Sequence, residues 1–484
     1  MPISEDPATR RPALAAFAAL NAAAAWAGVV GLTLGGIEFG DTLDARLPFE
    51  SLVLAAVGLA LIVAVPMTLL AWWAWTGNPR TLTLAFLVGI AVIGWIALQV
   101  IVLRAVSLFQ PVYLAVGVWF IAESERVHLR PTTRGALVAS AGALAVAVGV
   151  GLVPQFVENL PSAGALLCAV GILGGGAAVV AGARMMLHGR PVGTRVAGTV
   201  ATLLGVVVAT WLIAPGVAAT NVPPSVITAT PGDLGVEFES VTMSTVDGVE
   251  LAGWYLTGTS DAAIVVAHGA GSTRSDALEQ AEVLNRNGFG VLLVDARGHG
   301  DSDGTAMDFG WYGDADLIAA IDHLAERTDV DPDRIGLLGL SMGGEETIGV
   351  AAADTRVRAV VAEGATARTA QDKAWLSDAY GWRGWLQEQV EKVQFGITDL
   401  LTDASPPTTL RSAVGDAVGT PFLLITASAV ADEGDAAEYL RTAAPERVTV
   451  WTVEGASHTG GLDTSPVEWE ERVVSFLDEH LRSS

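Results

Sequence analysis

The sequence of 484 residues predicts a membrane α-helical bundle of about seven spans, followed by an α/β domain with a mainly parallel sheet and a small helical cap. Three observations support this fold class. Long apolar runs fill residues 1–220, and beyond residue 236 the apolar runs become short and alternate with helix-like stretches. The charge changes at the same place. Residues 1–220 carry eleven arginines, no lysine and nine acidic residues, whereas residues 221–484 carry 16 basic and 43 acidic residues.

The first 220 residues are predicted to be a transmembrane helical domain. A span needs about 20 mostly apolar residues, and seven runs without an ionised side chain in their middle approach or exceed that length: 13–35, 51–75, 81–103, 105–122, 135–157, 162–183 and 196–219. The fourth run is short and contains Pro111, so six spans remain the alternative. Because ion and proton pathways need ionisable groups at depth, we interpret this domain as an anchor.

The placement of arginine predicts how the chain is oriented in the cell membrane. Cytoplasmic loops retain positive charge, and an N-terminus in the cytoplasm puts nine arginines inside and only Arg46 and Arg104 outside. Seven spans then deliver the second domain to the extracytoplasmic side, whereas six would leave it in the cytoplasm. The inner set is Arg10, Arg11, Arg80, Arg126, Arg130, Arg134, Arg184, Arg190 and Arg195.

Composition and motifs argue against a disulfide, a nucleic-acid partner, a cofactor and a metal. The single cysteine, Cys168, rules out an intrachain disulfide. A formal charge of −27 over residues 221–484 repels nucleic acid. No phosphate-binding loop, zinc-ligand spacing or EF-hand occurs, so no cofactor and no metal are expected. The oligomeric state is left open.

Residues 221–235 are predicted to be a linker, because three prolines and two glycines exclude a helix or a central strand. The α/β domain then covers 236–484. Val236–Thr245 and Val249–Leu256 flank a turn at Asp247 and predict a hairpin. The next six apolar runs are typical of strands buried on both faces: Ala262–Ala267, Gly290–Val294, Ile335–Leu340, Val357–Ala362, Phe422–Thr426 and Val448–Val453. Helices are expected over Ser275–Asn287 and Trp311–Arg327.

Ser341 is the candidate nucleophile. It lies within Gly339–Gly343, a Gly-x-Ser-x-Gly segment between a predicted strand and a predicted helix. Glycines around such a serine allow the sharp turn that exposes its hydroxyl. A serine hydroxyl needs a base. His458 follows the last predicted strand, whereas His480 is expected to face solvent on the final helix, so His458 is predicted to be that base.

A carboxylate should orient the histidine, and the strand Phe422–Thr426 is followed by an acidic segment. Asp432 is preferred there as the third catalytic residue, Glu433 is the alternative, and Asp435 is expected to begin the next helix. Two backbone N–H groups should stabilise the oxyanion. We assign them to Met342, which follows the nucleophile, and to Ala270, in the loop after the first buried strand.

These motifs resemble the α/β-hydrolase superfamily over roughly 236–484, most closely its serine esterase, dienelactone-hydrolase-like and acyl-peptidase-like branches. The motifs are His268–Gly271, Asp295–Ser302 and Gly339–Gly344, in the usual order. The resemblance implies that Arg297 and His299 shape a loop and take no catalytic part. One departure concerns the acid, which here comes slightly later after its strand than is usual in the family.

Residues 366–415 are predicted to form the cap, with a cluster of aromatic residues that line an acyl pocket, dip toward the bilayer or only pack on the sheet: Trp375, Tyr380, Trp382, Trp385 and Phe395. Together these features predict a membrane-anchored serine hydrolase. It would cleave carboxylic ester or thioester bonds of a small-molecule or lipid-like acyl substrate through an acyl-enzyme on Ser341. The alternatives are a serine peptidase or acyltransferase with the same triad, and a non-catalytic membrane receptor module.

Overall fold

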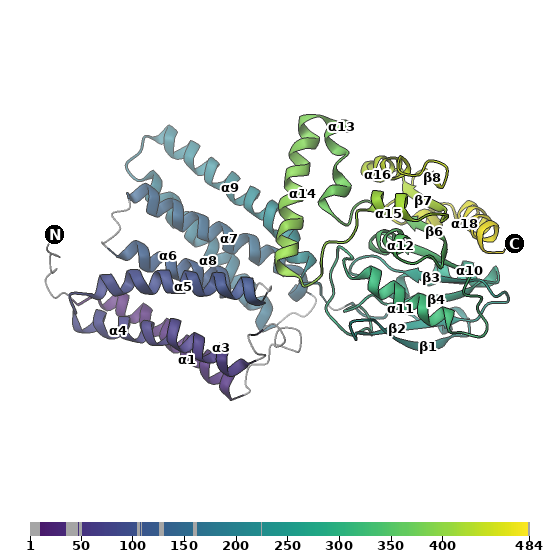
Figure 1. Cartoon of the computed structure of the whole chain (residues 1–484). Helices are drawn as coiled ribbons and strands as arrows, with labels where there is room; N and C mark the ends of the chain where they lie inside the picture. The colour runs from purple at the N-terminus through teal and green to yellow at the C-terminus, as the bar shows by residue number, and fades with distance from the viewer. Residues whose placement is uncertain are drawn as a thin grey trace. The chain divides into compact units, whose positions relative to one another are not determined.

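The computed structural model describes residues 10–34, 47, 51–103, 107, 109–124, 130–157, 162–223 and 225–482 (Figure 1). The chain divides into two compact units, the first formed by Met1–Ala218 with Leu400–Thr402 and the second by Ala219–Asp399 with Asp403–Ser484. The predicted fold class is confirmed: apolar helices come first, and an α/β domain with a mostly parallel sheet follows.

The described part of the first unit is helical. Its helices are α1 (Pro12–Thr33), α3 (Leu52–Leu59), α4 (Val65–Thr76), α5 (Thr81–Leu103), α6 (Phe109–Glu123), α7 (Pro131–Val157), α8 (Ala163–Leu187) and α9 (Val192–Ala219). A π-helical turn, η2 (Ala60–Ala64), joins α3 to α4. Arg46, Arg104 and Arg126, which enter the predicted orientation, lie outside the described residues.

Among the described residues, six helices are long and apolar enough to cross a membrane: Pro12–Thr33, Leu52–Thr76, Thr81–Val100, Pro131–Phe156, Gly164–Leu187 and Val192–Ala219. The fourth predicted span corresponds to α6, a shorter apolar helix. Pro111 lies in its first turn, where proline is tolerated. These helices are compatible with a membrane protein, while the number of spans and the orientation stay predictions.

Small residues bring α7 and α8 together. A Cβ added to Gly142 would come within 2.5 Å of the Gly175 carbonyl oxygen, and one added to Gly175 within 2.7 Å of the Gly142 carbonyl oxygen. Gly135 and Gly182 approach each other in the same way, two turns along. Backbone contact of this kind is how apolar helices associate where no hydrophobic driving force acts between them.

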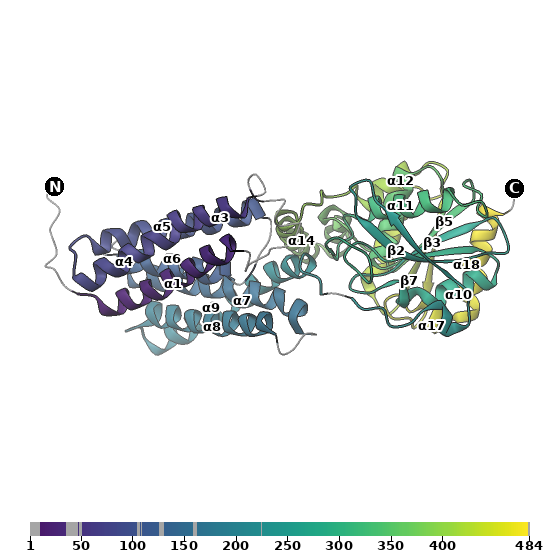
Figure 2. The ribbon, with the colours of Figure 1, turned by 90° about the horizontal axis from the view of Figure 1, so that it is seen from below.

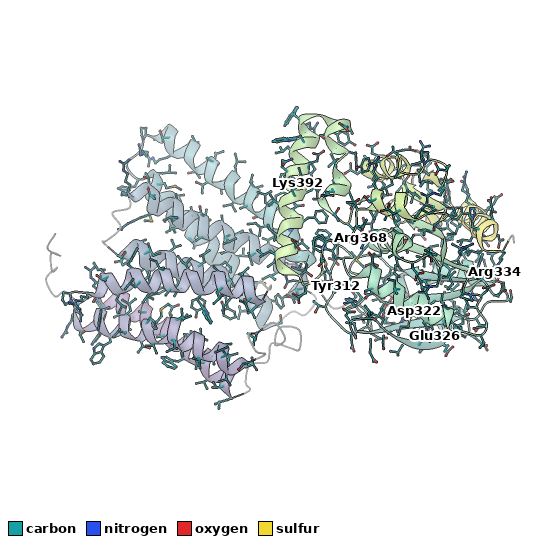
Figure 3. The ribbon with its side chains drawn as sticks, viewed as in Figure 1. Tyr312, Asp322, Glu326, Arg334, Arg368 and Lys392 are labelled. Atoms are coloured by element: carbon teal, nitrogen blue, oxygen red, sulfur yellow. The ribbon has the colours of Figure 1, made fainter. Side chains whose placement is uncertain are left out.

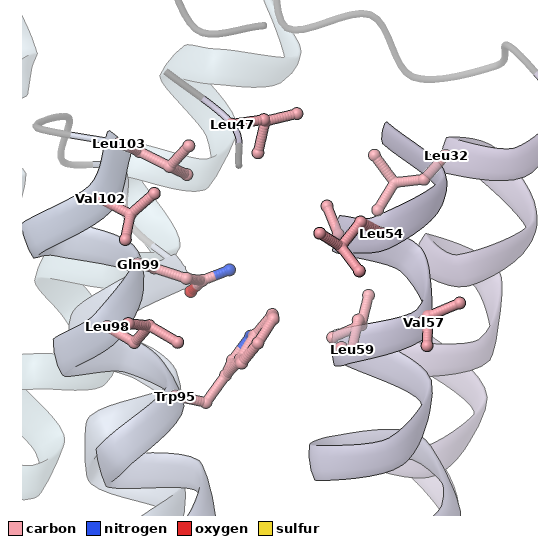
Figure 4. Close-up of a pocket in the computed structure, with 12 residues that line it drawn as sticks. Leu32, Leu47, Leu54, Val57, Leu59, Trp95, Leu98, Gln99, Val102 and Leu103 are labelled. Atoms are coloured by element: carbon pink, nitrogen blue, oxygen red, sulfur yellow. The ribbon is translucent and has the colours of Figure 1, made fainter. Parts of the chain in front are cut away.

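A cavity of about 320 Å³ lies among α1, α3 and α5 (Figure 4). Its lining is almost entirely apolar, including Leu54, Leu98 and Val102, and the amide of Gln99 is its polar side chain. The π-helical turn follows directly after Leu59, which also lines the cavity. π-turns often occur beside functional sites.

The second unit is built on an eight-stranded sheet within residues 225–482, in the order β1-β2-β4-β3-β5-β6-β7-β8. Figure 2 labels four of these strands, β2, β3, β5 and β7. The strands are β1 (Glu239–Ser244), β2 (Glu250–Leu256), β3 (Ala263–Ala267), β4 (Gly290–Val294), β5 (Ile335–Leu340), β6 (Val357–Glu363), β7 (Phe422–Ala427) and β8 (Val448–Val453). β1 and β2 form the predicted antiparallel hairpin, β2 also pairs antiparallel with β4, and the other pairs are parallel.

Helices cover both faces of this sheet, which is why its central strands are apolar throughout. One core cluster joins the sheet to α11 (Gly313–Ala325), α12 (Met342–Ala353), α15 (Leu410–Asp416) and α16 (Ala431–Arg441). The other joins it to α10 (Leu278–Arg286), α17 (Gly461–Thr464) and α18 (Pro466–Leu481). On α18 the buried residues Trp469, Val473 and Leu477 recur every fourth position, as expected of one helix face.

Three 3₁₀ turns and the cap helices complete the described part of the second unit. The turns are η3 (Pro231–Leu234), η4 (Arg274–Ala277) and η5 (Ala370–Lys373). The predicted cap contains η5, α13 (Leu376–Tyr380), α14 (Trp382–Leu401) and most of α15. The predicted linker contains η3 and is held to the unit by Ser275, whose hydroxyl donates to the Ala229 carbonyl at 2.8 Å.

Candidate active site

Ser341 lies on a sharp turn between β5 and α12. Its backbone has φ 53° and ψ −116°, in the left-handed half of conformational space that residues other than glycine rarely adopt. The turn is held by its N–H, which donates to the Glu363 carbonyl of β6 at 2.7 Å. Strain of this kind persists only where surrounding structure enforces it, and here it presents the side chain at the carboxyl edge of the parallel strands.

The glycines on either side of Ser341 are required by space. A Cβ at Gly339 would overlap the Gly343 carbonyl, and a Cβ at Gly343 would come within 2.5 Å of the Ala267 carbonyl oxygen at the end of β3. Both glycines therefore allow the turn to close against the neighbouring strand. The two glycines of the Gly-x-Ser-x-Gly motif are therefore the residues that the close packing of this turn requires.

His458 reaches Ser341 from the loop between β8 and α17. Its Nε2 lies 2.8 Å from the Ser341 Oγ, although the two residues are 117 positions apart in the chain. The neighbouring segment also requires a glycine, since a Cβ at Gly364 would come within 2.9 Å of the His458 ring. The predicted nucleophile and base are thus brought together.

Glu433, and not Asp432, is the carboxylate beside His458. Its Oε1 lies 2.6 Å from the His458 Nδ1, and its Oε2 accepts the Ala427 N–H of β7 at 2.7 Å. The preference for Asp432 is corrected for a geometric reason. Both residues lie in the first turn of α16, where consecutive side chains point about 100° apart. Glu433 is fully buried toward the sheet, whereas Asp432 is half-buried.

The buried Glu433 carboxylate changes the basicity of the imidazole. Its hydrogen bond raises the pKa of His458 above the ordinary value of 6.5, against the partial burial of the ring, which lowers it. An Nδ1–H that donates to Glu433 leaves Nε2 as an acceptor for the Ser341 hydroxyl. The neutral ring is therefore oriented to take a proton from Ser341.

The raised pKa predicts the acid limb of the pH profile. Because the predicted base would work only when neutral, kcat/KM for ester hydrolysis should fall as the pH drops through the His458 pKa, with a midpoint above pH 6.5. Initial rates measured with an activated ester from acid to neutral pH check this. Glu345→Gln is the control, because burial raises the pKa of Glu345 to about 7 and this carboxyl group would titrate in the same pH range. That variant should keep the limb, displaced only slightly to lower pH, whereas loss of the limb would contradict the assignment to His458.

The two predicted oxyanion donors flank Ser341. Met342 is the first residue of α12, where backbone N–H groups have no partner within the helix. Ala270 lies in the exposed loop after β3. That loop reaches the nucleophile, since a Cβ on Gly269 would stand 3.4 Å from the Ser341 Cβ. Their roles as donors to an oxyanion stay predictions.

His268 fastens this loop and does not contact Ser341 among the described hydrogen bonds. Its Nδ1 lies 2.7 Å from the Gly269 carbonyl oxygen, and its Nε2 accepts the Ala296 N–H at 3.1 Å. Burial lowers its pKa to about 4, so it is a neutral hydrogen-bonding group that ties together the loops after β3 and β4. His480 is exposed on α18, as expected.

The loop after β4 is also held as the resemblance implied. Arg297 pairs with Asp316 at 2.6 Å and with Asp247 at 2.6 Å. His299 is buried with its Nδ1 3.1 Å from the Arg297 carbonyl oxygen, and burial lowers its pKa to about 4. Arg297 thus contacts a turn carboxylate and a carboxylate of α11, and His299 contacts loop backbone. Neither residue contacts Ser341 among the described hydrogen bonds.

Two buried glutamates near the site were missed at the level of sequence. Glu363, at the end of β6, accepts the Gly461 N–H at 2.7 Å and the Trp469 indole N–H at 3.0 Å, and so fastens the loop that carries His458. Glu345 accepts the N–H groups of Thr366 and Ala367 at 2.9 and 2.7 Å. A signal for Glu363 exists, because a carboxyl group ends a strand that is apolar and buried from Ala359 to Ala362.

Within the described residues, no group of three or more histidine, cysteine, aspartate or glutamate side chains has the arrangement of a metal site. At Ser341, a hydroxyl, an imidazole and a buried carboxylate lie in one hydrogen-bonded series. That series is suited to nucleophilic attack on a carbonyl carbon.

The comparison with protein families agrees with this fold and geometry. Residues 258–403 match the family described as serine aminopeptidase, S33. The match includes Ser341 and ends before Glu433 and His458. With the mostly parallel sheet and the strand–serine–helix turn, it supports an α/β-hydrolase domain in the second unit.

Two relatives are similar to part of this domain. Uncharacterized protein Rv2307c of Mycobacterium tuberculosis is 39% identical over 114 residues, which cover 23% of this chain and 40% of that protein. Thiohydrolase aneE of Aspergillus aculeatus is 35% identical over 131 residues, covering 26% of this chain and 40% of that protein. The chain thus spans about 40% of the length of these curated relatives.

Among solved structures, the esterase Pf2001 of Pyrococcus furiosus is similar at 25% identity. The alignment covers 54% of this chain and 100% of that one, with a TM-score of 0.42.

Proposed function

We propose that this protein is a membrane-anchored serine hydrolase that cleaves carboxylic ester or thioester bonds through an acyl-enzyme on Ser341. The observation that carries the proposal is the continuous hydrogen-bonded series from the Ser341 Oγ to the His458 Nε2, at 2.8 Å, and from the His458 Nδ1 to the Glu433 Oε1, at 2.6 Å. A non-catalytic receptor module would have no use for a strained serine aligned with a base and a buried acid.

In the first half-reaction the Ser341 Oγ attacks the carbonyl carbon while its proton passes to the His458 Nε2. The buried Glu433 carboxylate stabilises the imidazolium that forms. The N–H groups of Met342 and Ala270 stabilise the negative charge on the carbonyl oxygen. When the bond to the leaving group breaks, His458 returns the proton to the departing alcohol or thiol.

In the second half-reaction water replaces the leaving group. His458 takes a proton from the water as its oxygen attacks the acyl carbon, and the proton then returns to the Ser341 Oγ as the acid is released. Inclusion of thioesters is supported by the Aspergillus relative, whose name describes a thiohydrolase. Small or lipid-like acyl groups are the proposed substrates.

Peptidase activity is the second candidate, because the matching family is described as serine aminopeptidase. The same triad can attack an amide, whose poorer leaving group makes proton donation by His458 more demanding. A series of p-nitrophenyl esters of increasing chain length, compared with aminoacyl p-nitroanilides, separates the two activities by their kcat/KM values.

The long apolar helices are proposed to hold the chain in the cell membrane, with the N-terminus in the cytoplasm and the hydrolase unit outside. A fluorophosphonate probe that cannot cross membranes tests both parts of the proposal. It should label the wild-type protein in intact cells, and Ser341→Ala should abolish the labelling because the reactive hydroxyl is gone.

Two other outcomes of this experiment are informative. Labelling that appears only after the cells are opened would retain the serine hydrolase and reverse its orientation. Absence of labelling of the folded wild-type protein in opened cells, with a known serine hydrolase as the positive control, would overturn the catalytic proposal.

A further inference from the structure

Helix α14 carries an apolar face that the second unit leaves uncovered. Trp382, Trp385, Leu386 and Val393 are all exposed, and the two tryptophans have 75% and 56% of their surface accessible. Spacings of three, four and seven residues put these side chains on one side of a helix over about three turns. Gln389 is the polar residue among them, and the face contains no ionised group.

The opposite face of α14 is buried against the rest of the second unit. Glu388 is buried there and accepts the Ser377 N–H at 2.8 Å, and Phe395 packs on Phe309 with ring centroids 4.5 Å apart. The apolar residues that fold the cap are therefore distinct from those that face outward. The aromatic residues of the predicted cap therefore fall into two groups. Trp375 and Phe395 are packed in the interior, whereas Trp382 and Trp385 are exposed.

Basic residues border the exposed face. Arg383 and Lys392 are both exposed, one on each side of the apolar stripe (Figure 3 labels Lys392). The chain has two lysines, Lys373 and Lys392, and both lie in the cap. An apolar stripe with tryptophan, edged by long cationic side chains, is typical of helices that lie in the interface of a bilayer. The aliphatic stems of such side chains extend along the apolar layer while their charges stay in water.

The connection to the first unit keeps a bilayer within reach. The apolar helix α9 ends at Ala219, and Thr228 is already fastened to the second unit, because its N–H donates to the Ser275 Oγ at 3.2 Å. Eight residues separate these points, so they lie no more than about 30 Å apart even with the chain fully extended. The strong negative charge of residues 221–484 opposes attraction to anionic headgroups, which leaves the apolar stripe as the driving element.

We propose that the exposed face of α14 is a membrane-docking surface that inserts Trp382, Trp385, Leu386 and Val393 into the lipid interface. The proposal rests on the membrane location proposed above and is independent of catalysis. Docking ties the cap to the layer in which acyl chains reside, and so constrains the hydrolase unit at a second point beyond its chain connection.

Site-directed spin labelling of the full-length protein in phosphatidylcholine–phosphatidylglycerol vesicles tests this surface. The native thiol is removed by Cys168→Ala, and a nitroxide is attached after Val393→Cys. Val418→Cys is the matched control, because Val418 is 91% exposed on a different part of the same unit. Collision rates with oxygen, which concentrates in hydrocarbon, and with a nickel chelate, which stays in water, are then compared.

The ratio of oxygen to nickel collisions should be several-fold higher at Val393 than at Val418. Leu386→Cys, on the same face, should give the same result if the Val393 variant does not fold. Equal ratios at Val393 and Val418 would overturn the proposal. Protection of the Val393 label from both reagents would also overturn it, because protein and not lipid would then cover the face.

A third label distinguishes failure of docking from failure of the membrane location. Leu173 is 73% exposed on α8, so Leu173→Cys should report hydrocarbon if the helical unit spans the bilayer. A lipid-exposed Leu173 label together with a water-exposed Val393 label would overturn docking alone. Water exposure at both positions would overturn the membrane location and docking together.

Discussion

Replacing Ser341 with alanine is expected to lower kcat by about 10⁴–10⁶-fold, which is the size of effect seen when a triad serine is removed. The loss should be this large because in the proposed mechanism the hydroxyl oxygen forms the acyl-enzyme, and no neighbouring group among the described hydrogen bonds of the site can replace it. Initial rates with p-nitrophenyl esters, measured on purified protein at neutral pH, supply the test.

His458→Ala should cause a loss of similar size, and the double variant should be no slower than either single variant. Residues that act as one unit are not additive, since removing either one already stops the shared step. Additive losses, with the double variant far below both single variants, would mean that the two side chains contribute separately and would contradict the proposed mechanism.

Neither change should unfold the protein, which makes the kinetic result interpretable. Ser341 and His458 are partly exposed at the edge of the sheet, and the turn is held by the backbone bond to Glu363 and by its glycines. Thermal unfolding of the variants, followed by circular dichroism, provides the control.

Much of the second unit could be predicted because its signals are local. The strands from β3 to β8 lie where short apolar runs predict them, since burial on both faces leaves little room for polar residues. His458 could be chosen because two histidines follow Ser341 and the other lies on a helix with a solvent-facing side. Close packing around Gly339 and Gly343 explains why the motif is specific in this context.

What could not be predicted depends on where helices begin and on which polar groups are buried. The sequence predicts that Asp435 begins the helix, whereas α16 begins at Ala431. Asp432 and Glu433 therefore lie in its first turn, and the helix decides which of them faces His458. Helix boundaries are uncertain by a few residues from sequence. Glutamate is usually a solvated residue type, so sequence alone places Glu345 and Glu363 on the surface. In the structure both are buried and accept hydrogen bonds from backbone N–H groups of distant segments.

The first unit has the opposite character, because its apolar helices are evident from the sequence and the number that would cross a membrane is not. α6 is apolar but short, and length alone does not distinguish a short span from a helix that stays on one side. In the proposed membrane topology, the side on which the second unit lies depends on that one helix.

Glu433→Gln is expected to lower kcat by about 10³–10⁴-fold, comparable to the loss when a triad aspartate becomes an amide. The buried carboxylate holds the Nδ1–H tautomer, and an amide NH₂ at the same place would favour the other tautomer and remove the charge that stabilises the imidazolium. The amide oxygen can still accept the Ala427 N–H, so the helix start should keep its structure.

Asp432→Asn is the matched control, because it makes the same chemical change one residue earlier in the same helical turn. Its kcat should stay close to that of the wild-type protein, since Asp432 is half-buried and has no described contact with His458. Glu433→Asp should fall between the two, because the shorter side chain keeps the charge and loses reach. A large loss at Asp432 with little loss at Glu433 would mean that the helix rotates its other carboxylate toward the histidine during catalysis.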